Sequence, residues 1–207
     1  MTATLIGLTG GIATGKTTAS AYLASLGAEV LCADSIYHEL LRPISKRIPS
    51  PLATKIEQEF PGVLLSDGTI DRGQLGKQVF GQPQNLEKLG VITHPAVALE
   101  AANRMQKLEN LGINLIIYDV PLLFERGLDK TMAGVILIWV PEEIQINRLI
   151  IRDKISRTQA TQKLGSQLPI TEKKKKATWL IDNSHTQSQM YSQIDSLWSQ
   201  LNQPITK

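Results

Sequence analysis

A glycine-rich stretch near the N-terminus has the residue types and spacing needed to hold phosphate. Residues 5–18 read LIGLTGGIATGKTT and satisfy the pattern G-x-x-x-x-G-K-[ST]. Glycines let the backbone curl so that successive N–H groups point at phosphate oxygens, and the following helix adds the positive end of its dipole. Lys16 can place its charge on the phosphates, and Thr17 can offer a hydroxyl to Mg²⁺. We expect a nucleotide-binding P-loop with contacts from Gly11, Ala13, Thr14, Gly15, Lys16, Thr17 and Thr18.

The residues on either side of this motif indicate the elements that must hold it. An apolar run, residues 5–8, precedes the glycines. The apolar stripe of a helix follows and should end at Gly27; its residues are Ala19, Tyr22, Leu23 and Leu26. A glycine-rich turn that binds nothing is the alternative. A strand before the motif and an amphipathic helix after it are the context that a P-loop requires, so they favour phosphate binding.

Four further apolar segments are predicted to be strands, and helical patterns lie between them. They are residues 28–33, 114–120, 134–140 and 179–181. Apolar strands that are joined through helices are typical of a parallel sheet. We therefore predict an α/β fold built on a five-stranded parallel sheet.

Residues 35–112 contain no convincing strand and separate the second predicted strand from the third. Helices are expected over 35–42, capped by Ser35, over 52–60 and 74–80, and in a long segment with Pro95 in its first turn. We place the nucleotide-binding core at residues 1–34 and 113–207, with a helical insertion at 35–112. An insertion in this position would cover or complete a substrate site.

Composition excludes several classes of function. The formal charge of +3 over 207 residues and the pI near 9.0 favour anionic partners only weakly. A nucleotide ligand would explain so small a positive charge, and we expect neither nucleic acid nor a membrane as a partner. The single cysteine, Cys32, rules out an internal disulfide framework. Because no secretion signal or membrane-length apolar run is visible, we expect a cytoplasmic protein. Cys32 and the three histidines lack metal-ligand spacing, so we expect no structural metal.

Two aspartates end predicted strands and could act beside the phosphates. In parallel sheets, ligands bind at the carboxyl ends of the strands. Asp34 ends the second strand, where a carboxylate could orient or deprotonate a hydroxyl, contact Mg²⁺ through water, or only cap the next helix. Asp119 ends the third strand, in the position of a Walker-B acid, and it too could only cap a loop.

Arg148 and Arg152 are four residues apart, so they share a helix face at the start of a polar segment that has no strand. A solvated basic face is one explanation. We favour a lid over residues 148–176 that closes on the nucleotide, excludes water and brings these arginines to the phosphates. The lysine run at 173–176 is predicted to be plain surface.

Missing motifs narrow the reaction class. No Asp has a Gly three positions on and no Asn is followed by Lys, so the D-x-x-G and N-K-x-D motifs of GTPases are absent from the sequence. Motor and AAA-type ATPases need a longer chain for their coupling machinery, so a small-molecule kinase remains. Such a kinase needs a P-loop, a base beside the acceptor hydroxyl, an acceptor-binding insertion and mobile arginines.

The chain resembles the dephospho-coenzyme A kinase family over nearly its whole length. Its motifs follow in the family's order: LTGGIATGKTT, VLCAD, DGTIDRGQLGKQVF at 67–80, THPAV at 93–97, DVPLLFE at 119–125, RLIIRD at 148–153 and WLIDNS at 179–184. Several of these motifs are far more specific than a P-loop alone.

This resemblance implies ATP-dependent phosphorylation of the ribose 3′-hydroxyl of dephospho-coenzyme A, the last step of coenzyme A synthesis. It implies a P-loop kinase core, a helical CoA insertion and a lid, in a protein that we expect to be a monomer. By analogy Asp34 is the base, His94 and the Asp71–Arg72 region lie on the acceptor side, and Asp182 and Asn183 lie near the adenine. The P-loop pattern and the lid argument assign Lys16, Arg148 and Arg152 to the transferring phosphoryl group. The acceptor side comprises Asp34, Arg72, His94 and Asp119. Two interpretations compete with this one: another small-molecule or nucleoside kinase, and a nucleotide-binding regulator that has lost catalysis.

The sequence departs from the family pattern at several positions. Ala13 replaces a usual glycine, and Cys32 replaces the first aspartate of the family's V-x-D-A-D element, to which VLCAD corresponds. His38, Gly76 and Lys163 stand where the family usually has arginine. Replacing arginine removes the bidentate hydrogen bonding of its guanidinium group to phosphate, which lysine replaces only in part. These departures affect the expected substrate affinity and rate rather than the reaction class.

Overall fold

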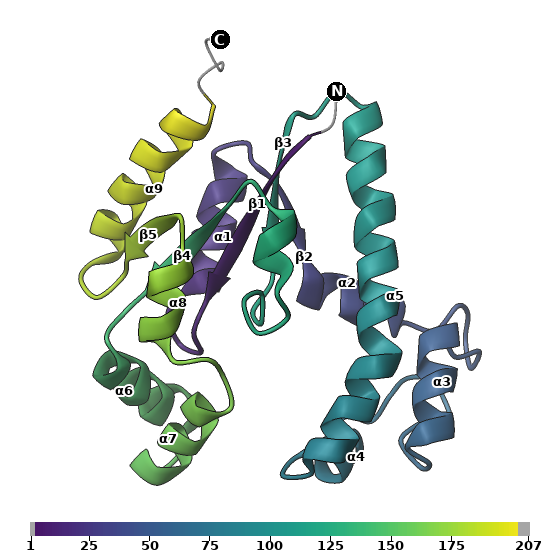
Figure 1. Ribbon diagram of the computed structural model, residues 1–207. Coiled ribbons are helices and arrows are strands. Elements are labelled where there is room, and N and C mark those ends of the chain that lie inside the picture. The colour runs from purple at the N-terminus through teal and green to yellow at the C-terminus, as the bar shows by residue number, and fades with distance from the viewer. Residues whose placement is uncertain (1–2, 203–207) are drawn as a thin grey trace. The chain divides into compact units, whose positions relative to one another are not determined.

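A central parallel sheet organises the protein, as seen in a computed structural model that describes residues 3–202 (Figure 1). Its strand order is β2-β3-β1-β4-β5. The strands are β1 (Thr4–Gly10), β2 (Glu29–Cys32), β3 (Leu115–Asp119), β4 (Gly134–Trp139) and β5 (Trp179–Asp182). The α/β class and the five-stranded parallel sheet predicted from the sequence are therefore confirmed.

Helices supply the remaining regular structure of the described residues. They are α1 (Lys16–Ser25), α2 (Ala33–Leu40), α3 (Pro51–Glu59), α4 (Arg72–Val79), α5 (Pro83–Asn110), the 3₁₀ turn η1 (Leu128–Thr131), α6 (Glu142–Asp153), α7 (Arg157–Gly165), α8 (Ile170–Lys176) and α9 (Gln187–Leu201). No helix between residues 3 and 202 combines the length and apolar character needed to cross a membrane.

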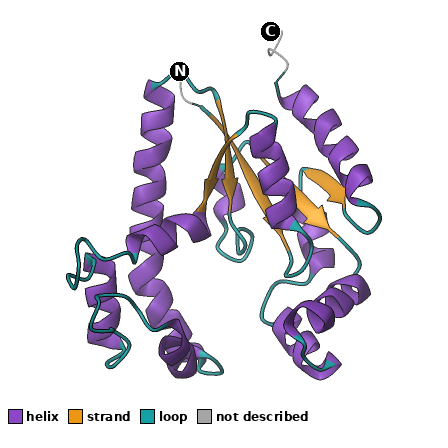
Figure 2. Cartoon of the chain, turned by 180° about the vertical axis from the view of Figure 1, so that it is seen from behind, coloured by secondary structure: helices purple, strands orange, loops and turns teal. Residues whose placement is uncertain are grey.

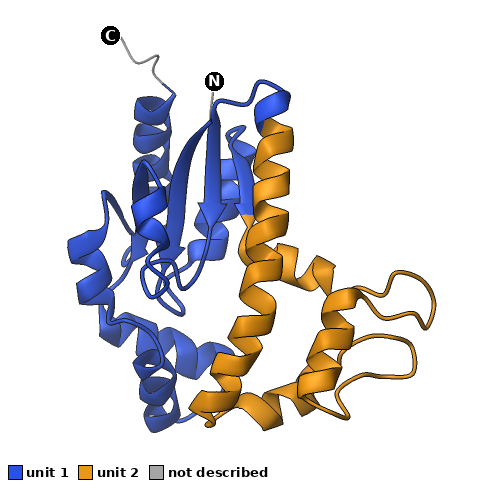
Figure 3. Cartoon of the chain, turned by 45° about the vertical axis from the view of Figure 1, so that its right-hand side comes forward, with its two compact units in different colours: residues 1–31, 109–207 blue, residues 32–108 orange. Residues whose placement is uncertain are grey.

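The chain divides into two compact units, shown in two colours in Figure 3. The first unit comprises residues 1–31 and 109–207, and the second comprises residues 32–108. Figure 2 shows the long run from α3 to α5 as helices and loops without strands, as the sequence predicts for the insertion.

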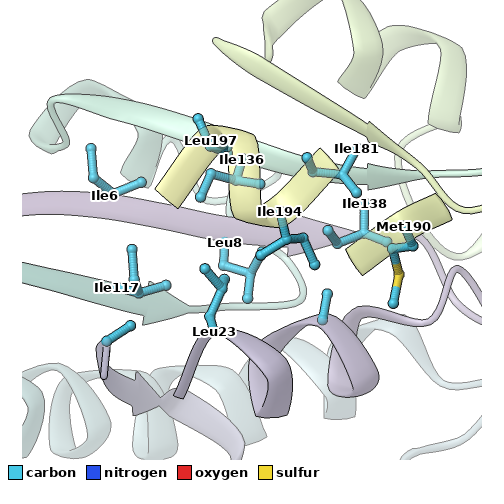
Figure 4. Close-up of a cluster of buried hydrophobic side chains, with 12 residues drawn as sticks. Ile6, Leu8, Leu23, Ile117, Ile136, Ile138, Ile181, Met190, Ile194 and Leu197 are labelled. Atoms are coloured by element: carbon cyan, nitrogen blue, oxygen red, sulfur yellow. The ribbon is translucent and has the colours of Figure 1, made fainter. Parts of the chain in front are cut away.

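The first unit has an apolar core in which α1 and α9 pack against the sheet (Figure 4). Alternate residues of β1 and β4 point into it, because successive side chains of a strand face opposite sides. Burying each such side chain contributes about 1.5–3 kcal/mol. The labelled members are Ile6, Leu8, Leu23, Ile117, Ile136, Ile138, Ile181, Met190, Ile194 and Leu197.

Strand register fixes which residues reach the carboxyl end of the sheet. Leu8 lies opposite Asp119 in the parallel pairing of β1 with β3, and Gly10 lies opposite Ile138 in the pairing with β4. Asp119 therefore ends β3 close to the point where β1 runs into the glycine-rich loop.

The second strand differs from the prediction. β2 ends at Cys32 and is an edge strand, so none of its residues is fully buried and Glu29 is exposed. α2 begins at Ala33, with Cys32 as its N-cap, and Asp34 lies in its first turn. The predicted cap at Ser35 is therefore wrong, and so is the placement of Asp34 at the strand end. A carboxylate in the first turn is favoured by the helix dipole without any capping hydrogen bond.

The second unit has its own apolar core between α2, α3, α4 and α5. The prediction that Pro95 opens the long helix is wrong, because α5 begins at Pro83 and carries Pro95 in its interior. Leu89, Ile92 and Ala96 form one apolar stripe that packs on this core on both sides of Pro95. The carbonyl that loses its helical donor belongs to Val91, which is 70% exposed, so water can replace the missing N–H. Packing therefore overrides the local proline signal.

Candidate functional site

The glycine-rich loop runs from the end of β1 at Gly10 to the start of α1 at Lys16. Gly15 is the N-cap of α1 in the left-handed conformation, with φ 90°. No side chain caps this helix end, so the first N–H groups of α1 have neither an intrahelical acceptor nor a side-chain acceptor. A Cβ atom added to Gly15 would overlap Nδ2 of Asn183, and one added to Gly11 would overlap Nε2 of Gln145. A side chain at either position would therefore displace the amide group of Asn183 or Gln145.

Five consecutive carbonyl groups of the loop, from Gly10 to Thr14, each accept a hydrogen bond from a side chain. The donors are Lys173 Nζ to Gly10 (3.4 Å), Thr14 Oγ1 to Gly11 (2.9 Å), Gln145 Nε2 to Ile12 (2.7 Å), Arg148 Nη1 to Ala13 (3.4 Å) and Asn183 Nδ2 to Thr14 (2.8 Å). The carbonyl oxygens are thereby held away from any ligand, and the loop presents its N–H groups instead.

The N–H groups of the loop divide into two sets. Ile12 donates to Gln167 Oε1 at 3.0 Å, and Thr14 donates to the Gly11 carbonyl. Within residues 3–202, the N–H groups of Ala13, Gly15, Lys16 and Thr17 donate to no protein acceptor. N–H groups without a protein acceptor at a helix N-terminus form an anion site. The positive end of the helix dipole adds to their attraction for phosphate.

Ala13 stands where the family pattern has glycine, and its backbone has φ 61°. This is the left-handed region, in which a residue with a Cβ atom is strained. Backbone strain of this kind is held in place by the surrounding contacts, here the bond from Arg148 to the Ala13 carbonyl.

Lys16 and Asp119 form an ion pair between Lys16 Nζ and Asp119 Oδ1, with both side chains largely buried. The pair connects the first residue of α1 with the last residue of β3, so the structure brings these two predicted residues together. Thr17 is exposed in the first turn of α1. No group of three or more His, Cys, Asp or Glu side chains that could hold a metal ion is found among the described residues.

The two predicted arginines have different surroundings. Arg148 is half-buried and donates to the carbonyls of Ala13 and Asn183, so it braces the loop. Arg152 is exposed and pairs with Asp153 at 2.8 Å, and Lys163 pairs with the same carboxylate at 2.7 Å. Hydrogen bonds from Arg152 and then Lys163 hold the pKa of Asp153 well below its usual range. Arg152 and Lys163 therefore meet at one carboxylate in the segment predicted to be a lid.

Asp182 and Asn183 lie at the end of β5, beside the loop. The Asp182 carboxylate accepts from the N–H and the hydroxyl of Ser184 at 2.8 and 2.5 Å, forming a local turn. Asn183 is buried and donates to Thr14, so its side chain supports the loop backbone.

The remaining predicted site residues belong to the second unit. Asp34 is exposed in the first turn of α2, and Arg72 is exposed as the first residue of α4. Burial raises the pKa of Tyr37 on α2, and the charge of Arg72 partly opposes that shift, so Arg72 lies near α2. His94 lies in the middle of α5 rather than at its start, and its ring lies against Gly90. The helix-start argument for His94 is therefore wrong.

Sequence reasoning missed several residues that hold the loop. Lys173 was predicted to be surface but is fully buried, whereas Lys174, Lys175 and Lys176 are exposed as expected. The spacing of Lys173 from the buried Ile170, one helical turn away, was the available signal. Gln145 and Gln167 carried no signal, because their partners are more than 130 residues away in the sequence.

Comparison with known proteins identifies the family. A family model described as dephospho-CoA kinase matches residues 4–189. The dephospho-CoA kinase of Shouchella clausii is 39% identical over 189 residues, covering 91% of this chain and 94% of that protein. Among solved structures, TT1252 from Thermus thermophilus has a TM-score of 0.79 at 28% identity, covering 98% of this chain and 100% of that one. A dephospho-CoA kinase from Campylobacter jejuni has a TM-score of 0.66 at 27% identity, covering 97% and 98%. The chain belongs to the dephospho-CoA kinase family.

Proposed function

We propose that this protein transfers the γ-phosphoryl group of ATP to the ribose 3′-hydroxyl of dephospho-coenzyme A, giving coenzyme A and ADP. The observation that carries the proposal is the loop between β1 and α1, with its carbonyls bonded outward and its N–H groups left for an anion. Membership of the dephospho-CoA kinase family supports the choice of acceptor.

The nucleotide is proposed to lie on the P-loop. The N–H groups of Ala13, Gly15, Lys16 and Thr17 bind phosphate oxygens, and Lys16 exchanges its ion pair with Asp119 for the β- and γ-phosphates. Gly11, Thr14 and Thr18 complete the loop around them. Asp182 and Asn183, at the end of β5, lie on the adenine side.

The loop has the donors that a magnesium nucleotide requires. Thr17 would hold Mg²⁺ through its hydroxyl, with Asp119 nearby through its contact with Lys16. Mg²⁺ needs only one or two protein ligands when phosphates and water supply the rest, so a dedicated acidic cluster is unnecessary. When bound, the ion would neutralise phosphate charge during transfer.

The acceptor is proposed to use residues of the insertion. Asp34 is two residues beyond the end of β2 and exposed, and we assign it to accept the proton of the 3′-hydroxyl. We assign Arg72, which is exposed at the start of α4, and His94 to the anionic acceptor. Asp119 is assigned to the side of the transferring phosphoryl group. Orienting the two reactants in this way can supply about 7–11 kcal/mol of the barrier reduction.

Residues 148–176 are proposed to act as a lid whose two ends are held at the P-loop, by Arg148 at one end and by Gln167 and Lys173 at the other, so that the part between them moves. Arg152 is 57% exposed and is paired with its neighbour Asp153, so it is available to move onto the transferring phosphoryl group. Arg148 is already fixed at the loop and would stabilise the same group from there. Closure would exclude water and so limit hydrolysis of ATP.

The test is an acceptor panel. Purified protein is incubated with ATP·Mg²⁺ and, separately, dephospho-CoA, nucleoside monophosphates or shikimate, and ADP formation is measured with identification of the phosphorylated product. We expect that, of these acceptors, only dephospho-CoA is phosphorylated and that its product carries a 3′-phosphate. Turnover with another acceptor, or nucleotide binding without transfer to any acceptor, would refute the proposal. We also propose a cytoplasmic monomer, which light scattering of the purified protein would test for oligomeric state.

A further inference from the structure

Lys173 of α8 is a buried cation whose surroundings are unlike those of its neighbours in the lysine run. Its side chain is 0% exposed, and its ammonium group pairs with Glu125 Oε1 at 2.8 Å. It also donates to the carbonyls of Gly10 at 3.4 Å and Pro121 at 3.3 Å. An ammonium group has three donors, and here each one has an acceptor.

These acceptors belong to the two loops that form the site. Gly10 is the first glycine of the P-loop, and Pro121 comes two residues after Asp119. Pro121 also accepts from the hydroxyl of Thr9 at 3.2 Å, so its carbonyl is bonded from β1 and from α8. Lys173 therefore contacts both of the segments whose side chains, Lys16 and Asp119, form an ion pair.

Further contacts fix the segment that carries Lys173. The N–H of Leu168 donates to Glu125 Oε1 at 3.0 Å, and Gln167 accepts from the N–H of Ile12. Residues 167–173 are thus bonded to the P-loop and to the loop after β3 by separate hydrogen bonds. Within residues 3–202, exposed lysines of the same run, such as Lys176, make no such contacts with these loops.

Burying an ammonium group removes it from water, and its ion pair must offset that loss. A fully buried lysine on a surface helix is therefore unfavourable unless its contacts are geometrically specific. The match between three donors and three acceptors, two of them backbone carbonyls at the site, provides this specificity.

We propose that Lys173 is a positioning residue for nucleotide binding. By holding the Gly10 and Pro121 carbonyls at a fixed separation, it aims the P-loop N–H groups and sets where Lys16 meets Asp119. Glu125 balances its charge. The inference rests on the proposed function only in requiring that the P-loop binds ATP or ADP.

The test separates positioning from stability. Lys173→Met removes the charge at similar length, Lys176→Met is the control from the same run, and Lys173→Met/Glu125→Gln leaves no unpaired charge while Gln can still accept from Leu168. For each variant, the Kd for ADP·Mg²⁺ is measured by calorimetry, thermal stability by unfolding, and kcat and KM for ATP with dephospho-CoA.

Lys173→Met is expected to bind ADP about tenfold more weakly than Lys176→Met, which corresponds to about 1.4 kcal/mol. The double variant should regain most of the lost thermal stability while its Kd stays raised, because the Gly10 carbonyl still lacks its donor. If Lys173→Met does not fold, the double variant carries the test.

A purely structural role predicts that ADP affinity returns together with stability in the double variant, and that result would overturn the inference. Wild-type affinity in Lys173→Met would also overturn it. These outcomes are independent of the acceptor, so a wild-type protein that binds ADP but does not phosphorylate dephospho-CoA would refute the proposed function alone.

Discussion

Replacing Gly15 by alanine tests whether Asn183 shapes the P-loop. The added methyl group would meet two obstacles. The backbone at Gly15 has φ 90°, a conformation unfavourable for alanine, and the new Cβ would overlap Nδ2 of Asn183. To relieve this overlap Asn183 must move, and its 2.8 Å hydrogen bond to the Thr14 carbonyl is then lost.

The expected loss can be estimated for each obstacle. A left-handed conformation costs alanine about 1–2 kcal/mol. Losing the bond from Asn183 leaves a buried acceptor unpaired, which costs a further ~1–3 kcal/mol. The unfolding free energy should therefore fall by about 2–5 kcal/mol. If ~1–2 kcal/mol of this cost comes from distortion of the P-loop, the affinity for nucleotide falls about 5- to 30-fold.

Gly27 provides a matched control at the other end of α1. It has φ 92°, and a Cβ added there would meet nothing within 4 Å. Gly27→Ala therefore introduces the same backbone strain without disturbing the site. Urea unfolding of both variants, together with calorimetric titration with ADP·Mg²⁺, separates the two contributions.

We expect Gly27→Ala to lose about 1–2 kcal/mol of stability and to keep its nucleotide affinity. Gly15→Ala should lose more stability and bind ADP more weakly. In Gly15→Ala/Asn183→Ala the overlap is gone, so the two substitutions should be non-additive. Equal stability losses at Gly15 and Gly27, with unchanged ADP affinity in Gly15→Ala, would refute the reasoning.

Three further predictions concern the base, the strained alanine and acid stability. Asp34→Asn should retain ADP affinity but lose kcat by about 100-fold or more, as removal of a general base does; near-full turnover would exclude the assigned role. Ala13→Gly should raise the unfolding free energy by about 1 kcal/mol, because glycine accepts φ 61° without strain, and a lower midpoint in urea would contradict this. Three backbone N–H groups, at residues 62–64, donate to the Glu57 carboxylate and lower its pKa from 4.5. Since the folded pKa is the lower one, this stabilisation is present above about pH 4.5 and lost as the pH falls through the folded value. Glu57→Gln should therefore be less stable than wild type by about 1 kcal/mol at pH 7 and equal to it in acid, which unfolding curves at several pH values would check.

Local signals predicted the elements that hold the P-loop. The glycine spacing, the apolar run before it and the stop at Gly27 are all near-neighbour features, and Gly27 has the positive φ expected after a helix. Strands three to five were apolar segments bounded by turns, and they are confirmed with shifts of at most one residue at their ends. These features depend on backbone preferences that the residues carry by themselves.

The errors arose where tertiary packing decided the outcome. Pro95 is a good helix start in isolation, but an apolar stripe on both sides of it keeps α5 continuous. Lys173 has the composition of a surface residue, and only its distant partners Glu125, Gly10 and Pro121 explain its burial. For Asp34, Arg72 and His94 the assigned roles came from the family resemblance, and they stay predictions.

The five outward carbonyl bonds of the P-loop have a consequence for how the chain is made. Four of the donors, Gln145, Arg148, Lys173 and Asn183, come from the second half of the chain, and the bond from Asn183 spans 169 residues. On the ribosome, the first 31 residues emerge long before any of these donors exist. A nascent chain stopped before Asn183 would carry the whole phosphate-binding motif in its sequence without being able to hold its shape, so nucleotide should not protect the growing polypeptide until synthesis is nearly finished.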